Sequence, residues 1–197
     1  DLHSFPTRRS SDLHIAEAAT QLRALVDIGE HVYLLGLAPP LTSGWRILQQ
    51  TSVAQMICRS RIDAIPGPQI RALSQENSDD MLALTALVFP GFFRTRTIEM
   101  GGYLGIYCGT TLAAMAGERM RLSRYQEISA VCTHPDFVSR GFAARLVAEL
   151  CNAALTRGLT PFLHVFRENV RAWALYERLG FVDRGDIPLW SLERTQE

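Results

Sequence analysis

The stretch HPDFVSRGFAARL, residues 134–146, joins a strand-like run to a helical run through Gly141. The first N–H groups of a helix have no partner within the helix and lie at its positive dipole end, so such a junction can bind phosphate oxygens. Gly141 lets the backbone approach a ligand closely, and Ala143 is nearly as small. Phosphate-binding turns often contain two or three glycines, so this single-glycine stretch is also compatible with a plain connection.

A second segment, HVFRENVRAWALYERLGF (residues 164–181), again passes from a strand-like run into a helical one. Asn169 stands at the junction, and Tyr176 follows seven residues later. This spacing corresponds to two helical turns, so both side chains are predicted to project from one helix face.

Together the two segments resemble the GNAT superfamily of acetyl-CoA-dependent N-acyltransferases. The first segment matches as a strand ending in AVCTHP, followed by x-x-x-G-x-A at the start of a helix. The second matches as a strand followed by N-x-x-A-x-x-L-Y-x-x-x-G-F and is the more specific of the two. The likeness extends over about residues 68–190. The matching residues of the second segment are Asn169, Ala172, Leu175, Tyr176, Gly180 and Phe181.

The resemblance implies an α/β fold with a mixed sheet, in which the adjacent parallel strands 127–133 and 160–166 splay apart. The implied co-substrate is acetyl-CoA. Its pantetheine arm would lie between these strands and pair with the backbone around Val131, Cys132 and Thr133. Its pyrophosphate would bind the N–H groups of the turn. The turn residues implied in this contact are Ser139, Arg140, Gly141, Phe142, Ala143 and Ala144.

The resemblance also implies roles in catalysis. Tyr176 would lie near the thioester sulfur and protonate the departing CoA thiolate, a role that suits a phenol with a pKa of about 10. Asn169 would contact the pantetheine or order its own helix. The implied enzyme is an N-acetyltransferase in which a deprotonated primary amine attacks the thioester directly, and no metal is needed.

The turn departs from the family pattern, which is Gln/Arg-x-x-Gly-x-Gly/Ala. Val138 occupies the first position, so a side-chain contact to phosphate is expected to be lost. Ser139 stands where many members have glycine, and Arg140 can supply replacement charge. Because the main contacts come from backbone N–H groups, we expect the site to persist.

The general base is less defined by the sequence. The position of Glu127 relative to the turn matches that of the catalytic glutamate in histone-acetylating members, but a strand-end glutamate that faces water is the alternative. His164 is a second candidate, because histidine titrates near neutral pH. The alternative for His164 is a hydrogen-bonded residue at the edge of the core. A third possibility is a water chain to a backbone carbonyl.

Two aromatic features have two interpretations each. Residues 89–97, FPGFFRTRT, could form a substrate loop with Arg94 and Arg96 facing an acidic group, or could simply pack on the surface. Trp173 could belong to the core or cover the co-substrate.

Periodicity and turn residues predict the elements that position these groups. We expect strands at 31–37, 70–73, 127–133 and 160–166, and one or two strands at 45–57. Helices are predicted at 15–26, 79–88 with Ser78 or Asp79 as its cap, 142–155 and 169–180. Hairpins are predicted at 103–122 and at 181–192.

The chain is expected to contain a small N-terminal module, residues 14–67, and a GNAT domain, residues 68–197. The boundary rests on the stretch DAIPGPQ at residues 63–69. The module resembles a partial second GNAT half. Residues 1–13 resemble translated sequencing-adapter sequence and lack the apolar region of a secretory signal, so we expect them to be non-native.

Composition excludes several classes of protein. The 197 residues include 47% hydrophobic and 20% charged residues with a formal net charge of +0, which argues against general electrostatic binding of nucleic acid. No apolar run approaches the length of a membrane span, and the four cysteines show no metal-binding spacing. We expect a cytoplasmic monomer or homodimer that binds no metal, acts on a small-molecule or peptide amine, and associates with neither nucleic acid nor membrane.

Two other hypotheses compete with an active enzyme. A CoA-binding or regulatory module without catalysis is favoured by Val138 and Ser139 and opposed by Asn169 and Tyr176. A dinucleotide-binding enzyme is disfavoured, because no G-x-G-x-x-G follows a strand.

Overall fold

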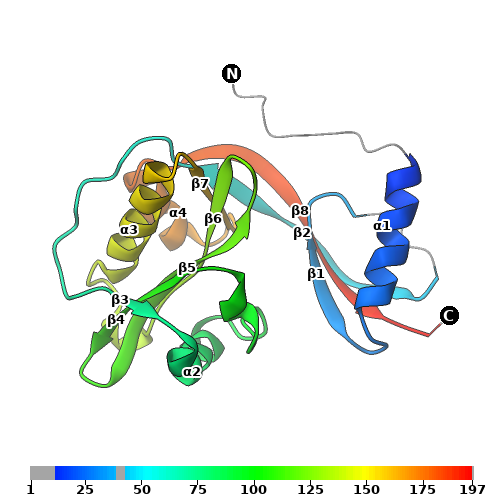
Figure 1. The fold of residues 1–197 in the computed structure, drawn as a ribbon, viewed down its shortest axis with the longest axis horizontal. Helices are drawn as coiled ribbons and strands as arrows, with labels where there is room; N and C mark the ends of the chain where they lie inside the picture. The colour runs from blue at the N-terminus through cyan, green and yellow to red at the C-terminus, as the bar shows by residue number, and fades with distance from the viewer. Residues whose placement is uncertain (1–11, 39–42, 197) are drawn as a thin grey trace. The chain divides into compact units, whose positions relative to one another are not determined.

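The computed structural model describes residues 12–38 and 43–196. They form one mixed eight-stranded sheet in the order β1-β8-β2-β7-β6-β5-β4-β3, with helices packed on it (Figure 1). The strands are β1 (His31–Leu35), β2 (Trp45–Ile57), β3 (Arg71–Leu73), β4 (Tyr103–Cys108), β5 (Thr111–Arg121), β6 (Tyr125–Thr133), β7 (Thr160–Val165) and β8 (Val182–Arg194). The α-helices are α1 (Asp12–Leu25), α2 (Ser78–Val88), α3 (Phe142–Thr156) and α4 (Val170–Arg178). The expected mixed α/β fold is confirmed.

The chain divides into two compact units. The smaller unit comprises residues 1–53 and 186–197, and the larger one comprises residues 54–185. Strands β2 and β8 contribute residues to both units. This division falls before residue 54, whereas the sequence suggested a linker at 63–69. That stretch has no regular secondary structure and lies against α3, since Arg145 donates to the carbonyl of Ile65. Just before it, the side chain of Asn152 bonds the backbone of Ile62. Most of residues 1–13 lie outside the described part of the chain.

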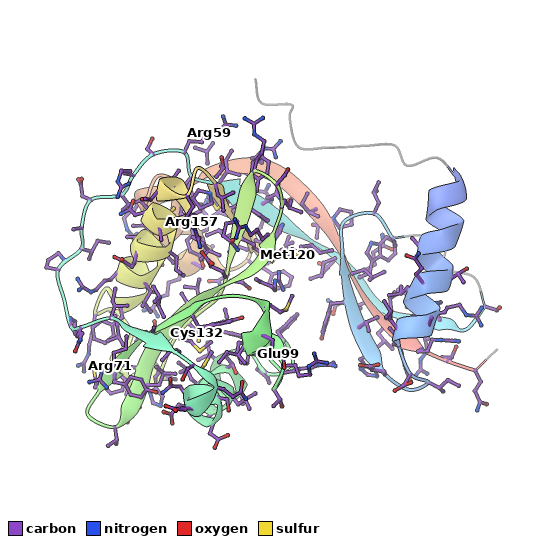
Figure 2. The ribbon with its side chains drawn as sticks, viewed as in Figure 1. Arg59, Arg71, Glu99, Met120, Cys132 and Arg157 are labelled. Atoms are coloured by element: carbon purple, nitrogen blue, oxygen red, sulfur yellow. The ribbon has the colours of Figure 1, made fainter. Side chains whose placement is uncertain are left out.

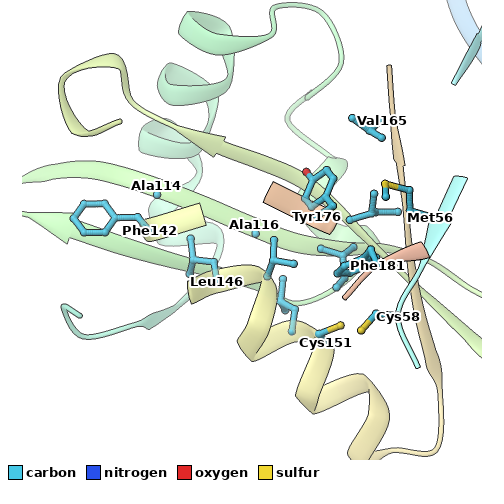
Figure 3. Packing of buried hydrophobic residues seen from close by; sticks show 14 of the residues in the cluster. Met56, Cys58, Ala114, Ala116, Phe142, Leu146, Cys151, Val165, Tyr176 and Phe181 are labelled. Atoms are coloured by element: carbon cyan, nitrogen blue, oxygen red, sulfur yellow. The ribbon is translucent and has the colours of Figure 1, made fainter. Parts of the chain in front are cut away.

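The larger unit has a hydrophobic cluster on each face of its sheet. One cluster packs α3 and α4 against the sheet through residues such as Leu146, Cys151 and Tyr176 (Figure 3). The other packs α2 against the opposite face and includes Met81, Leu84 and Cys132; Cys132 is labelled in Figure 2. Alternation along each strand therefore assigns its side chains to the α3 face or the α2 face.

Most predicted elements of the larger unit are present, including the hairpin formed by β4 and β5. The hairpin predicted at 181–192 is wrong, because β8 is a single strand of 13 residues. Gly185, at φ 107°, forms an irregularity inside the strand rather than a reversal, and its N–H donates to Asp183 Oδ1 over 2.9 Å. The predicted caps of α2 are also wrong: the helix begins at Ser78, and Asn77 precedes it. Residues 45–57 form one strand.

Candidate active site

The parallel strands β6 and β7 pair over only part of their length. The pairs are Tyr125 with Thr160, Gln126 with Pro161, and Glu127 with Phe162. Beyond the third pair, residues Phe162 to Val165 of β7 pair with β2, and β6 stays bonded to β5. The predicted splay between the two strands is therefore present, and it leaves a gap in the backbone ladder that we call the fork, between residues 128–133 and residues 163–165.

A bulge in β6 lies within the fork. The β5–β6 register shifts between the pairs Met115–Cys132 and Gly117–Ser129, so two residues of β6 lie opposite Ala116 alone. The first of them, Ala130, has φ 52°, which is left-handed backbone for a residue with a Cβ. A bulge bends its strand and increases its twist. The bulge therefore reorients β6 at the residues implied to bind pantetheine: Val131, Cys132 and Thr133.

The turn after β6 leads directly into α3. A short 3-10 turn, Pro135–Phe137, is followed by Ser139 at φ 65° and Gly141 at φ 77°, and α3 begins at Phe142. Arg145 N–H makes the first bond of the helix, to Gly141 O over 3.0 Å. The N–H groups of Phe142, Ala143 and Ala144 precede that bond at the positive end of a 15-residue helix. The turn thus has the donor arrangement expected of a phosphate site.

Two arginines flank this turn. Arg140, which was predicted, lies with its guanidinium carbon 5.0 Å from the centre of the Phe137 ring. Arg171 was missed; its Nη2 donates to Ser139 Oγ over 3.2 Å from the first turn of α4. A cation in the first turn of a helix is opposed by the helix dipole, and that unfavourable placement is the signal that could have identified Arg171.

Asn169 caps α4. Its Oδ1 accepts from Ala172 N–H over 3.1 Å, so its side chain orders the helix. Two roles were expected for Asn169, contact with pantetheine and ordering of its own helix. The hydrogen bond to Ala172 is evidence for the second role. The cap also fixes the start of the helix that carries Tyr176.

Tyr176 lies in the core cluster between α4 and the sheet. The residue is 6% exposed, and its ring centre lies 5.8 Å from that of Phe181, with the hydroxyl pointing away from Phe181 (Figure 3). Burial, reinforced by neighbouring Cys132 of β6, raises the pKa of the phenol. Among the described residues, none makes a hydrogen bond with its hydroxyl. A protonated phenol with an unengaged O–H therefore lies beside the fork.

Glu127 does not face water, since it is 1% exposed. Arg119 contacts its carboxylate through Nε at 2.8 Å and Nη2 at 2.6 Å, and His164 Nδ1 lies 2.9 Å from Oε1. Burial raises the pKa of this carboxyl, but the hydrogen bonds from Arg119 and His164 outweigh burial and hold the pKa below its ordinary value. Glu127 is therefore ionised and firmly bound, and His164 is hydrogen-bonded at the edge of the core.

For both aromatic features the contacts give evidence for packing. Phe93 packs edge-on against Tyr103 at 5.6 Å, and Arg96 is paired with Glu99, so part of the 89–97 stretch serves packing. Trp173 contacts the core and lies under the guanidinium of Arg167 at 5.0 Å.

Two general properties come from the described residues alone. They contain no group of three or more His, Cys, Asp or Glu side chains arranged to hold a metal ion. None of their helices combines the length and apolar character needed to cross a bilayer.

The fork, the turn and the helix of Tyr176 define a class of fold: a mixed α/β protein in which two parallel strands splay apart beside a strand–turn–helix junction. A family model for FR47-like proteins matches residues 103–191. The crystal structure of a protein from Novosphingobium aromaticivorans DSM 12444, assigned to the GNAT family of acetyltransferases, is 33% identical to this chain. That match covers 91% of this chain and 81% of the other, with a TM-score of 0.80. The chain belongs to the GNAT family of acetyltransferases.

More distant structures share the fold. The ribosomal-protein-S18-alanine N-acetyltransferase from Escherichia coli is 20% identical, with a TM-score of 0.53 over 66% of this chain and 95% of that one. A GNAT-family acetyltransferase from Colwellia psychrerythraea is 12% identical, with a TM-score of 0.61 over 95% of this chain and 74% of that one. The comparison with curated proteins gives no match.

Proposed function

We propose that this protein transfers an acetyl group from acetyl-CoA to a primary amine by direct attack of the amine on the thioester. The observation that carries the proposal is the fork: β6–β7 pairing ends at Glu127 and Phe162, and Tyr176 lies buried beside the opening. Family membership supports acetyl transfer. Beyond family membership, we propose that the acceptor is a primary amine and that the residues below have the roles given to them.

The described residues fit acetyl-CoA. Among residues Val131, Cys132 and Thr133, the backbone groups that face the fork suit the amides of the pantetheine arm, which can pair with a strand edge as a peptide does. The N–H groups of residues 139–144 suit the pyrophosphate, and Arg140 and Arg171 add positive charge there. These contacts require no side chain at Val138.

The chemistry divides between backbone and side chains. N–H groups of β6 within the fork polarise the thioester carbonyl as it gains negative charge. Tyr176 donates its proton to the sulfur as the C–S bond breaks, and the amine nitrogen forms the new C–N bond. Burial keeps the phenol protonated until the thiolate forms. The amine gives up one proton in the same process, and a base must accept it.

We assign that base to the pair formed by Glu127 and His164. Their side chains are joined at 2.9 Å and lie at the closed end of the fork, next to the last β6–β7 backbone pair. The carboxylate supplies negative charge, which stabilises the imidazole when it takes a proton.

The rival function is CoA binding without catalysis. One observation favours it: the carboxylate of Glu127 is fully engaged by neighbouring donors and offers no free lone pair. An intact Tyr176 with an unengaged hydroxyl opposes it.

Thermal unfolding with acetyl-CoA and thiol release with an amine panel test both functions. The panel includes small amines, amino acids, an aminoglycoside and peptides with free N-termini. We expect acetyl-CoA to raise the unfolding temperature, and at least one amine to accelerate thiol release. Stabilisation without amine-dependent thiol release would favour the rival, and no stabilisation by acetyl-CoA would reject both.

A further inference from the structure

A chain of hydrogen bonds crosses five neighbouring strands with one residue from each. The residues are Arg119 on β5, Glu127 on β6, His164 on β7, Gln55 on β2 and Arg184 on β8, which is also their order across the sheet. The successive contacts measure 2.6 Å, 2.9 Å, 3.1 Å and 3.4 Å. We call this chain the polar row.

The inner members of the polar row share the α2 face of the sheet. Their neighbours along each strand, such as Ile128, Leu163 and Met56, pack into the cluster on the α3 face, so alternation directs Glu127, His164 and Gln55 to the other side. Gln55 and His164 are direct partners in the β2–β7 register. All three are nearly buried, which makes an unsatisfied polar atom costly.

Hydrogen-bonding rules at the two ends of the row fix the protons between them. An ionised carboxylate only accepts, so His164 Nδ1 must carry the proton that it donates to Glu127. A guanidinium only donates, so the atom of Gln55 that faces Arg184 Nη1 must be the amide oxygen. The Gln55 amide nitrogen then faces His164 Nε2, which has to accept. The ring is therefore neutral, with its proton on Nδ1.

Glu127 itself has no lone pair to spare. It accepts two bonds from Arg119, one from Met120 N–H at 3.3 Å and one from His164, four in total. A carboxylate offers about four acceptor positions. Direct proton transfer from an amine to Glu127 would have to displace one of these donors.

Nε2 of His164 is the basic atom whose hydrogen bond is more readily replaced, because its partner is a neutral amide and not a charged group. Tyr103 of β4 interacts electrostatically with Arg119 and Glu127, and burial raises the pKa of its phenol to about 12, so it adds no charge at that end of the row. The edge of the Phe162 ring packs against the imidazole at 5.5 Å.

We propose that Gln55 and Arg184 are positioning residues that hold His164 in the neutral Nδ1–H form, so that Nε2 can accept the proton lost by the acceptor amine. The amine N–H bond breaks, the proton bonds Nε2 in place of the Gln55 amide, and Glu127 balances the imidazolium charge through Nδ1–H. The ring later passes the proton to water. The proton-accepting step rests on the proposed acetyl transfer, whereas the tautomer does not.

Nitrogen-15 NMR of the imidazole side chains in the full chain tests the tautomer. In the wild type at neutral pH we expect His164 to be protonated at Nδ1 and unprotonated at Nε2. Gln55→Glu places an acceptor at Nε2 and should give a ring protonated at both nitrogens. Arg184→Met releases the amide and should broaden or shift the Nε2 signal, while the exposed Arg178→Met should change neither nitrogen. A wild-type ring that carries a proton on Nε2 would overturn the proposal.

Kinetics with the best amine of the panel test the consequence. Gln55→Glu should lower kcat by about 100-fold, the scale of general-base catalysis, with the KM for acetyl-CoA changed by less than about twofold. A kcat close to wild type would refute the positioning role even if the tautomer is as expected. If the wild type transfers no acetyl group to any amine while the tautomer is confirmed, the proton-accepting role falls together with the proposed function, and only the tautomer assignment stands.

Discussion

Arg171 Nη2 and Ser139 Oγ are joined by a hydrogen bond of 3.2 Å that links the first turn of α4 to the turn preceding α3. The two segments that carry the family motif, 32 residues apart at this point, therefore meet at the candidate phosphate site. The bond also holds a cation next to the N–H groups of α3. The single glycine left open the alternative that residues 134–146 merely connect β6 to α3. The contact with Arg171 of the second segment makes that alternative less well supported.

Ser139→Gly should stabilise the protein. Ser139 has φ 65°, and a left-handed residue with a Cβ costs about 1–2 kcal/mol relative to glycine. We expect a gain of about 1 kcal/mol in the free energy of unfolding, reduced by loss of the bond to Arg171, as measured by urea denaturation. Ser139→Ala is the matched control, because it removes the hydroxyl but keeps the strain. Equal stability of the glycine and alanine variants would contradict the strain argument.

Ala130→Val should damage the fork. Ala130 has φ 52°, and a β-branched residue tolerates left-handed backbone poorly. We expect a loss of about 2 kcal/mol in stability and weaker acetyl-CoA binding by calorimetry, because the bulge reorients the residues proposed to bind pantetheine. Ala130→Gly should keep the bulge and the binding. Wild-type affinity in the folded valine variant would show that the bulge does not shape the site.

Asn169→Ala should destabilise the protein by about 1 kcal/mol, because it removes the side-chain cap of α4. Asn169→Ser keeps a capping oxygen and should recover most of this loss. If Asn169 acts on acetyl-CoA only by ordering the helix, the serine variant should also recover the affinity. An affinity that stays low in a stable serine variant would instead indicate direct contact with the co-substrate.

Tyr176→Phe should lower kcat far more than it weakens acetyl-CoA binding. General acid catalysis contributes about 10²–10⁴-fold, so a loss of kcat in that range is expected while the dissociation constant changes by less than about threefold. Single-turnover thiol release and calorimetry measure the two effects separately. Equal losses in both would refute the general-acid role.

Arg119→Met should reverse the pH dependence that Glu127 gives to stability. In the wild type the folded-state pKa of Glu127 lies below its ordinary value, so its contribution is present above the unfolded pKa of about 4.3 and is lost as pH falls through the folded pKa. Without Arg119, burial dominates and raises the folded pKa. In the variant, the contribution of Glu127 to the free energy of unfolding is then full below the unfolded pKa and is lost as pH rises through the folded pKa.

Denaturation midpoints between about pH 3 and pH 6 distinguish the two cases. The variant should also lose at most about 3 kcal/mol at pH 7, the lower end for a buried ion pair, because Arg119 itself is partly exposed. The matched control is Arg157→Met, which breaks an exposed pair with Glu118 and should leave the slope unchanged. A slope in Arg119→Met that equals that of the wild type would contradict the assignment.

Local patterns were sufficient to predict the strand–turn–helix junction at Gly141 and the helix that carries Tyr176, although they misplaced the cap of α2. Each depends on residues close together in the chain, because a glycine or a capping side chain between an apolar run and a periodic run indicates where a helix begins. The hairpin at 181–192 was mispredicted because the Arg-Gly-Asp stretch resembles a reversal, whereas β8 runs through Gly185 as one strand that lies between β1 and β2 in the sheet.

The polar row could not be predicted in the same way. Gln55 and Arg184 lie 129 residues apart, and only the register of β2, β7 and β8 places them in contact. Glu127 and His164 were both singled out, but their bond to each other depends on where the β6–β7 ladder ends. Side-chain contacts across strands follow from register, which a single sequence specifies weakly.

The fork also bears on how the sheet avoids self-association. A strand edge with free N–H and C=O groups can template pairing with other chains, and proteins usually cover or charge such edges. Here the free edge of β6 lies inside the strand order, with β5 bonded along its other side and β7 joined to it at one end. A strand of a second polypeptide, with its side chains, would have to widen the angle between β6 and β7, whereas the pantetheine arm carries only a pair of methyl groups and one hydroxyl beside its methylenes and amides. Under the proposed function, this position leaves the free edge of β6 to a narrow ligand and shields it from pairing with a strand of another chain.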